Sequence, residues 1–120
     1  MSKQRAAVLK TKRVYEPRSE DDGFRVFVER LWPRGVTKEK AAIDLWMKEI
    51  APSPELRKWY HHDQEKWKEF AARYRSEIHK KKELIESLKE RLSDGNLTLL
   101  YASREKVFNS ASVLRDFLLG

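Results

Sequence analysis

Two stretches that lie far apart in the chain resemble buried β-strands, and they constrain the fold more than any other feature. Phe24–Leu31 opens with the almost continuous apolar run FRVFV, and Asn96–Ala102 reads NLTLLYA. Near-continuous apolar strands are typical of parallel sheets, which are covered on both faces. Because helical segments separate the two stretches, we expect them to run parallel, joined by a crossover connection.

The rest of the chain supplies helices and a further strand. Ala7–Tyr15 has the alternation of a strand, and the turn-rich loop Glu16–Gly23 joins it to the next one. These first two strands would form either an antiparallel pair or an edge addition to the sheet. Ser53 before Pro54 is a helix start signal, because Pro is favoured at the first helical position. Strands separated by helices predict an α/β fold: a small sheet of three to four strands, mostly parallel, flanked by helices.

Helix signals fill the other segments. Thr37 is suited to cap a short helix, and Asp63 is suited to cap the longest one. A further helix is expected to end at Gly95, and the last one is expected over Asn109–Leu119. In the longest helix a stripe of apolar residues at helical spacing predicts a core-facing side: Trp67, Phe70, Ala71, Tyr74 and Ile78.

Length and composition fit one domain over residues 1–120, since 40% of the residues are hydrophobic and 38% are charged. The chain has no cysteine, which excludes disulfides, thiol nucleophiles and cysteine-bound zinc and suits a reducing cytoplasm. The N-terminal segment MSKQRAAVLKTKR has too short an apolar run for a signal peptide or a membrane span. We therefore expect an intracellular, cytoplasmic protein that has no membrane partner.

The formal net charge is +7, and residues 1–82 carry the whole surplus. A net positive field attracts anionic partners such as nucleic acid. However, the long helical stretch alternates Lys and Arg with Glu, as solvated helix faces do. Both interpretations of the charge stay open at the level of sequence.

The segment RLWPRG, residues 30–35, follows the second strand directly, and YASRE ends the strand at 96–102. If these strands are parallel, both loops lie at the sheet edge where open α/β folds bind ligands. Arginine guanidinium groups suit phosphate or carboxylate groups. This predicts a ligand-binding set: Arg30, Trp32, Arg34, Ser103, Arg104 and Asn109. In the alternative interpretation Trp32 and Pro33 close the core, and the two loop arginines pair with Glu29, Asp44 or Glu49.

A catalytic role has weaker support in the sequence. His62 titrates near neutral pH and is a candidate general acid or base, together with Asp63 and Glu105. The adjacent residues of the HHD segment are poorly placed to hold one metal ion, and no nucleotide-loop, nucleophile-elbow or calcium-loop motif is present. We expect neither a metal nor a cofactor. The basic and aromatic stretch Lys58–Arg75 suits either single-stranded nucleic acid or a core-facing helix stripe.

Three segments together resemble one family. RLWPRG, the APSPELRKW segment and the final LLYASRE segment are similar to the YeaO-like proteins, catalogued as domain of unknown function 488. The resemblance runs from about Arg13 to Leu118 and implies an α/β domain whose biochemical activity is unassigned. It departs at two positions, because the family more often has Asp where Glu105 stands and His where Phe108 stands. A phenylalanine cannot transfer a proton, so this member fits binding better than catalysis.

Three functions follow as hypotheses. The leading one is binding of an anionic ligand at the RLWPRG and YASRE edge, such as a nucleotide, a phosphorylated metabolite or a nucleic-acid strand. The second is an enzyme that acts on a phosphorylated or nucleic-acid substrate. The third is an interaction module, including a homodimer, that docks through a tryptophan-rich surface.

Overall fold

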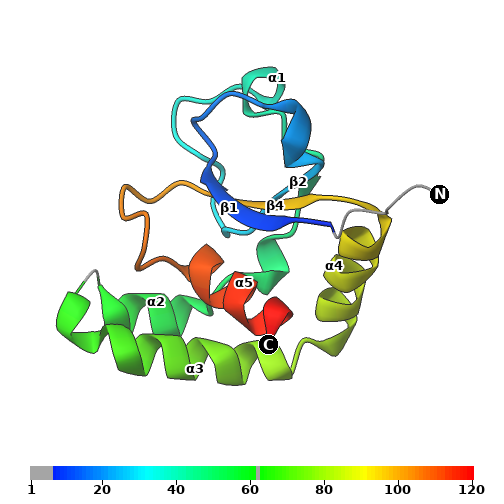
Figure 1. The fold of residues 1–120 in the computed structure, drawn as a ribbon. Coiled ribbons are helices and arrows are strands. Elements are labelled where there is room, and N and C mark those ends of the chain that lie inside the picture. Colours follow the sequence, from blue (N-terminus) through cyan, green and yellow to red (C-terminus); the bar gives the residue numbers. More distant parts are fainter. Residues whose placement is uncertain (1–6, 62) are drawn as a thin grey trace.

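The computed structural model describes residues 7–61 and 63–120 and contains a four-stranded sheet in which all the pairings are parallel (Figure 1). The strand order is β1-β4-β2-β3. This confirms the predicted α/β class and the parallel relation of the two apolar strands. The strands are β1 (Leu9–Arg13), β2 (Phe24–Phe27), β3 (Leu45–Trp46) and β4 (Leu97–Tyr101).

The antiparallel alternative for the first two strands is wrong. They do not pair with each other, because β4 lies between them and pairs with both: Leu97 is opposite Leu9 on one side and Phe24 on the other. Every residue of β4 is buried, so the most apolar strand takes a central position. β1 joins the sheet at its edge, as the second alternative expected.

The helices are α1 (Lys38–Ala41), α2 (Pro54–Tyr60), α3 (Trp67–His79), α4 (Lys82–Asp94) and α5 (Ser110–Leu119). Thr37 and Ser53 cap their helices as predicted, each accepting a hydrogen bond from a backbone N–H. Asp63 caps a 3₁₀ turn at Gln64–Lys66 that leads into α3, so its cap lies one turn earlier than expected. Polar side chains at these positions satisfy N–H groups that the helix itself leaves free.

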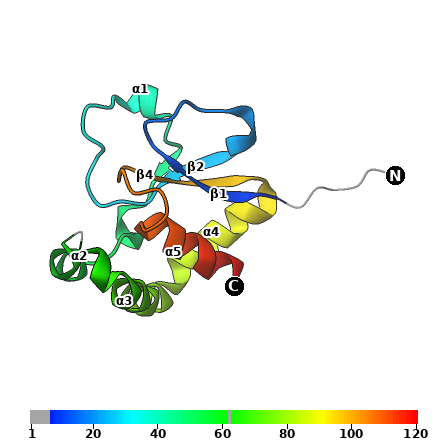
Figure 2. The ribbon, with the colours of Figure 1, turned by 60° about the vertical axis from the view of Figure 1, so that its left-hand side comes forward.

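Helices α2 to α5 lie on one face of the sheet, and α1 with the long loops covers the other (Figures 1 and 2). On the helical face, Leu97 and Leu99 pack in the same core as Tyr74 and Ile78, so the predicted stripe of α3 is core. On the other face Phe27, Leu100 and Val14 pack with the half-buried rings of Trp32 and Trp46. Both faces of the two central strands are therefore covered.

A buried ion pair lies on the α1 face. Arg25 and Asp22 are fully buried, and the Arg25 Nη1 donates to Asp22 Oδ2 at 2.6 Å. Arg25 also donates to the carbonyl oxygens of Ala41 (2.9 Å) and Ala42 (3.0 Å), where α1 ends. This one side chain therefore connects β2 with α1.

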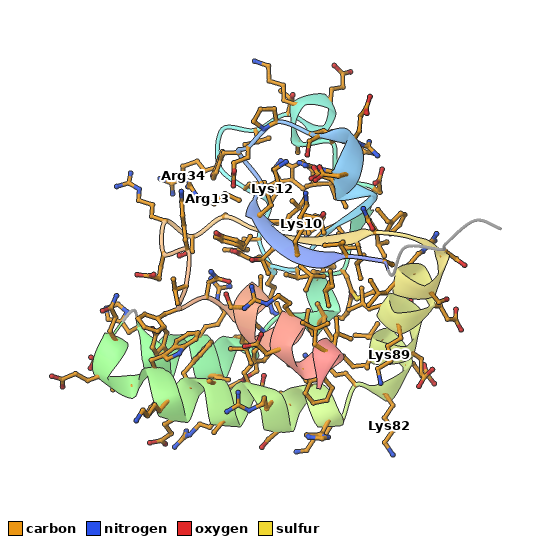
Figure 3. All side chains as sticks on the ribbon, in the orientation of Figure 1. Lys10, Lys12, Arg13, Arg34, Lys82 and Lys89 are labelled. Atoms are coloured by element: carbon orange, nitrogen blue, oxygen red, sulfur yellow. The ribbon has the colours of Figure 1, made fainter. Side chains whose placement is uncertain are left out.

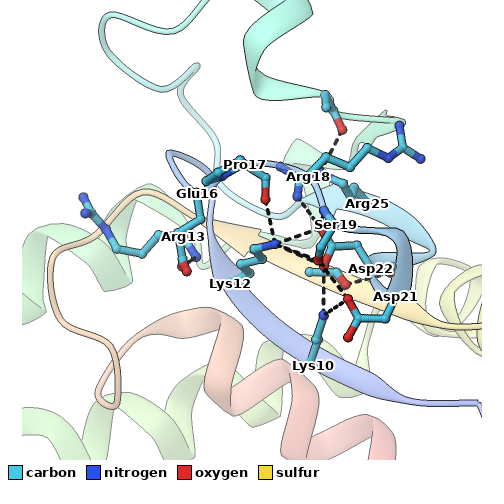
Figure 4. A network of polar contacts seen from close by, with 12 residues as sticks. Lys10, Lys12, Arg13, Glu16, Pro17, Arg18, Ser19, Asp21, Asp22 and Arg25 are labelled. Atoms are coloured by element: carbon cyan, nitrogen blue, oxygen red, sulfur yellow. Dashed lines mark hydrogen bonds and ion pairs between the residues drawn. The ribbon is translucent and has the colours of Figure 1, made fainter.

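Other strands complete the network around Asp22, as Figure 4 shows. From β1, Lys10 lies 2.8 Å and Lys12 lies 3.0 Å from the Asp22 carboxylate. The Thr98 hydroxyl of β4 donates to the Asp22 carbonyl oxygen at 2.7 Å. Burial raises the pKa of Asp22, but hydrogen bonds from Lys10, from the Ser19 backbone N–H and from Lys12 outweigh it and hold this pKa far below its ordinary value of 3.8.

Replacement of Asp22 by Asn should destabilise the protein and change its response to acid. At neutral pH we expect a loss of roughly 3 kcal/mol, because the variant leaves Arg25 buried without its counter-charge. Because the folded-state pKa of Asp22 is depressed, its contribution is present above the unfolded-state pKa and is lost as pH falls below about 4. Urea unfolding at pH 7 and pH 3 measures both effects.

The matched control is Asp116→Asn, since Asp116 is exposed and its one ion pair within residues 7–61 and 63–120 is with its neighbour Arg115. It should change the free energy of unfolding by less than about 0.5 kcal/mol. A difference between wild type and Asp22→Asn that is as large at pH 3 as at pH 7 would contradict the depressed pKa.

Gly23 precedes β2 at a point where the backbone leaves no room for a side chain. Its φ is 64°, and a Cβ there would overlap the carbonyl group of Asn96, which accepts the Phe24 N–H at 3.0 Å. Gly35 also has a positive φ, 74°, but a Cβ there would meet nothing within 4 Å. A side chain at Gly35 would therefore add backbone strain alone, whereas a side chain at Gly23 would add both backbone strain and steric overlap.

Alanine substitution at these two glycines should give different losses of stability. Gly35→Ala adds only the cost of a left-handed backbone, roughly 1–2 kcal/mol. Gly23→Ala adds the displacement of Asn96, and we expect it to cost about 2 kcal/mol more. Equal losses in chemical denaturation would show that the approach of Asn96 does not constrain the fold.

Candidate functional site

A cavity of about 470 Å³ opens beside the carboxyl ends of β2 and β4. Its walls come from the two loops that follow these strands, from α2, and from the starts of α3 and α5. Cavities of this size and position commonly hold small ligands in α/β folds. The sheet therefore brings the two predicted loops to one edge and leaves a space between them and α2.

Three of the six predicted ligand-binding residues line this cavity, namely Arg30, Ser103 and Asn109. Trp32 does not, because its ring packs on the α1 face, 5.4 Å from the ring of Trp46. Its indole N–H donates to the Val36 carbonyl oxygen at 2.8 Å. Trp32 therefore serves the core, as the alternative interpretation expected.

Arg34 and Arg104 have exposed side chains and do not line the cavity. Figure 3 shows Arg34 on the α1 side of the sheet, where its carbonyl oxygen accepts a hydrogen bond from the Tyr15 hydroxyl at 3.1 Å. RLWPRG is thus divided between the two faces of the sheet: Arg30 and Leu31 line the cavity, and the rest of the segment lies outside it.

Arg30 is the unusual group in the cavity wall. Its Nε is buried and has no hydrogen-bond partner among the described residues. One terminal nitrogen reaches the Ala51 carbonyl oxygen at 3.5 Å, which is the limit of a hydrogen bond. The described residues include no carboxylate that forms an ion pair with Arg30.

Two of the three carboxylates that the alternative interpretation pairs with the loop arginines contact other groups. Asp44 contacts Arg18 at 3.5 Å, and Glu29 accepts the Ala102 backbone N–H at 2.6 Å. The interpretation of Arg30 as an ion-paired structural brace is therefore wrong for the described residues. A guanidinium group without its full set of partners can hydrogen-bond an incoming anion.

Helix α2 adds further positive charge to the wall through Arg57 and Lys58, and His61 follows at its end. His61 has a left-handed backbone, with a φ of 44°. Ser110, the first residue of α5, also lines the cavity, and helix N-termini favour negative charge. Together these groups make a cation-rich wall around the single carboxylate of Glu29.

Another part of the cavity wall is aromatic. It contains Tyr60, Trp67, Phe70 and Phe108. The ring of Trp67 lies 5.4 Å from the rings of both Phe70 and Phe108. Burial raises the pKa of the Tyr60 hydroxyl above its ordinary value of 10, and the charges of Glu105 and Asp63 add to this, so it stays protonated at neutral pH.

The structure describes two of the three predicted catalytic residues. His62 lies outside the described residues. Asp63 is exposed, and its carboxylate accepts the Glu65 N–H at 3.1 Å as a cap. Glu105 accepts the N–H of Val107 at 3.2 Å, and neither Asp63 nor Glu105 lines the cavity.

Asn109 has a structural role besides its place in the wall. Its side-chain oxygen accepts the Ser112 N–H at 2.9 Å, and its amide donates to the Glu105 carbonyl oxygen at 2.9 Å. The Ser103 hydroxyl accepts the Glu105 N–H at 3.0 Å. These bonds hold the loop between β4 and α5 in shape, so Asn109 positions the edge of the cavity.

Sequence patterns did not indicate that α2 contributes to the site. Arg57 and Lys58 lie on this short helix, and His61 follows it with a left-handed backbone. No local pattern indicates that these residues line a cavity together with the loop after β2, because the contact depends on how α2 and α3 pack.

Substitution of Arg30 by Met tests whether this arginine supports the fold. Because its buried Nε has no partner in the described part of the chain, an apolar side chain of similar length should change the free energy of unfolding by less than about 1 kcal/mol, or increase it. By contrast, Arg25→Met should cost roughly 3 kcal/mol, because it leaves Asp22 without its buried partner. Guanidinium unfolding of both variants gives the comparison, and an equal loss in the two would make Arg30 a structural residue.

None of the described helices is long and apolar enough to cross a membrane. A comparison with solved structures found no match. Among curated proteins, the uncharacterized protein Rv3073c of Mycobacterium tuberculosis is 41% identical over 112 residues, which cover 93% of this chain and 94% of that protein. The uncharacterized protein YeaO of Escherichia coli is 40% identical over 110 residues, 92% of this chain and 96% of YeaO.

A family model described as the inactive DUF488-N3 subclade matches residues 8–120, which is almost the whole chain and includes every wall of the cavity described above. The YeaO-like resemblance of the three sequence segments is thus confirmed over their full length. The chain belongs to the inactive DUF488-N3 subclade, a group of YeaO-like proteins.

Proposed function

We propose that this protein binds an anionic, phosphate-bearing ligand in the cavity between the β2 and β4 loops. The observation that carries the proposal is Arg30, which lines the cavity and whose buried Nε has no hydrogen-bond partner among the described residues. A buried donor without a partner costs free energy, which a ligand that accepts its hydrogen bond would recover. Phosphate oxygens are suitable acceptors, because they match the planar donor geometry of arginine.

The surroundings of Arg30 favour the same class of ligand. Arg57 and Lys58 add two exposed positive charges at the wall, and α5 begins there with Ser110. The carboxylate of Glu29 is held by the Ala102 N–H. The net charge of +7 would draw anions toward the molecule from a distance.

Binding without catalysis is the better-supported form of the proposal. Asp63 caps a turn, and Glu105 is bonded to its own loop. Phe108 lines the cavity and has no proton to transfer. The word "inactive" in the description of the family model is consistent with this, although it describes the subclade as a group.

Thermal unfolding with a ligand panel should reveal the binding. The panel consists of inorganic phosphate, phosphorylated sugars, nucleotides and short oligonucleotides. At about a hundred times its dissociation constant, a ligand of the native state adds about 2.7 kcal/mol. In a domain of this length that should raise the Tm by roughly 10 °C. We expect this shift in wild type and its loss in Arg30→Met.

The matched control is Arg34→Met, which removes an exposed arginine from the same loop but outside the cavity. It should keep the full shift. If no anion raises the Tm of wild type, the proposal is wrong. If Arg34→Met abolishes the shift and Arg30→Met keeps it, binding occurs on the α1 side of the sheet instead.

A further inference from the structure

We infer that the ligand is a nucleoside phosphate, whose phosphate meets Arg30 and whose base lies against the aromatic wall of the same cavity. This inference rests on the proposed function and narrows its ligand class. The observation behind it is the apolar part of the cavity wall, which a phosphate group alone would not contact.

The aromatic wall is continuous. The rings of Tyr60 and Phe70 are 4.4 Å apart, those of Phe70 and Trp67 are 5.4 Å apart and stacked, and those of Trp67 and Phe108 are 5.4 Å apart. Three of these rings belong to α2 and α3, and Phe108 comes from the loop before α5. Side chains of this kind bind flat bases by stacking and apolar contact.

Part of the cavity wall exposes apolar surface to solvent. Phe108 is 42% exposed and Leu31 is 69% exposed, and both line the cavity. They come from the two different strand-end loops, after β4 and β2 respectively. Exposed large apolar side chains gathered at a cavity indicate a binding surface. A base that enters beside them would remove this surface from water.

Polar groups for a ribose or a base are also present. The carboxylate of Glu29 accepts one backbone N–H through Oε2, and a carboxylate has more acceptor sites than one bond uses. The hydroxyl groups of Tyr60 and Ser103 lie in the same wall. Glu29 suits donors such as ribose hydroxyls, while Arg30 suits the phosphate, so the charge pattern distinguishes the two ends of a nucleotide.

The volume agrees with this ligand. A cavity of about 470 Å³ lies in the range that holds whole small molecules. A free nucleotide and the 5′-phosphorylated end of a nucleic-acid strand share the required chemistry, because each carries a base and a phosphate on the same sugar. They differ in the rest of the strand, which would have to leave the cavity beside the exposed Leu31 and Phe108.

Isothermal titration with three probes tests the inference: inorganic phosphate, ribose 5-phosphate and adenosine 5′-monophosphate. Because stacking of one base on aromatic side chains is worth about 1–3 kcal/mol, the nucleotide should bind between roughly fivefold and a hundredfold more tightly than ribose 5-phosphate. Phe108→Ala should remove most of that preference and leave the affinity for ribose 5-phosphate unchanged. Val107→Ala is the matched control, since Val107 is 64% exposed in the same loop but does not line the cavity.

The outcomes separate the inference from the proposed function. Equal affinities for the nucleotide and ribose 5-phosphate, both lost in Arg30→Met, would overturn the inference and leave the proposed function standing. No binding of any probe would overturn both. A nucleotide preference that survives in Phe108→Ala would show that the base lies elsewhere and would also overturn the inference.

A 5′-phosphorylated dinucleotide, added as a fourth probe, distinguishes a free nucleotide from a strand end. Tighter binding than the mononucleotide indicates a strand end, and equal or weaker binding indicates a free nucleotide.

Discussion

The buried ion pair of Asp22 and Arg25 holds the α1 side of this structure together. Arg25 connects β2 to the end of α1, and the lysines of β1 and the Thr98 hydroxyl of β4 converge on Asp22. The carboxylate of Asp22 contacts Arg25 and the two lysines, its carbonyl oxygen contacts Thr98, and Arg25 contacts α1, so this pair joins three strands and one helix. On this face Trp32 packs in the smaller hydrophobic core and anchors the loop between β2 and α1. The start of the same loop lies on the helical side of the sheet, where Arg30 lines the cavity.

Arg25 and Arg30 illustrate how one residue type serves two purposes in adjacent segments. Arg25 is fully buried and has a carboxylate and two carbonyl oxygens as partners. Among the residues that the structure describes, Arg30 has a buried Nε without a partner and one long contact to a carbonyl oxygen. A satisfied buried arginine contributes to folding, whereas an unsatisfied one lowers stability and is retained more readily where it meets a ligand.

Local signals in the sequence were sufficient for the elements of the fold but not for their arrangement. The apolar β4, the caps at Thr37 and Ser53 and the stripe of α3 all follow from residue patterns that act over a few positions. The central position of β4 depends on long-range pairing, which no local pattern encodes. The burial of Arg25 was not predictable for the same reason: its ion-pair partner Asp22 is three residues away, but the carbonyl oxygens of Ala41 and Ala42 that it also contacts lie 16 and 17 residues away.

For the candidate site, the sequence likewise predicted which loops take part but not how their residues are arranged. Parallel strands bring RLWPRG and YASRE to one edge, as expected from the chain order. The sequence could not show that consecutive residues of RLWPRG go to opposite faces, because this division follows from the packing of Trp32 against Trp46.

The most direct test of ligand binding at Arg30 is an NMR titration that observes the arginine side-chain Nε–H signals while adenosine 5′-monophosphate is added. We expect a large shift of the Arg30 Nε–H signal and of the Ser103 and Ser110 amide signals, with the Arg34 signal unchanged. Shifts confined to Arg34 and Arg104, or no shift of Arg30 at saturation, would contradict this expectation.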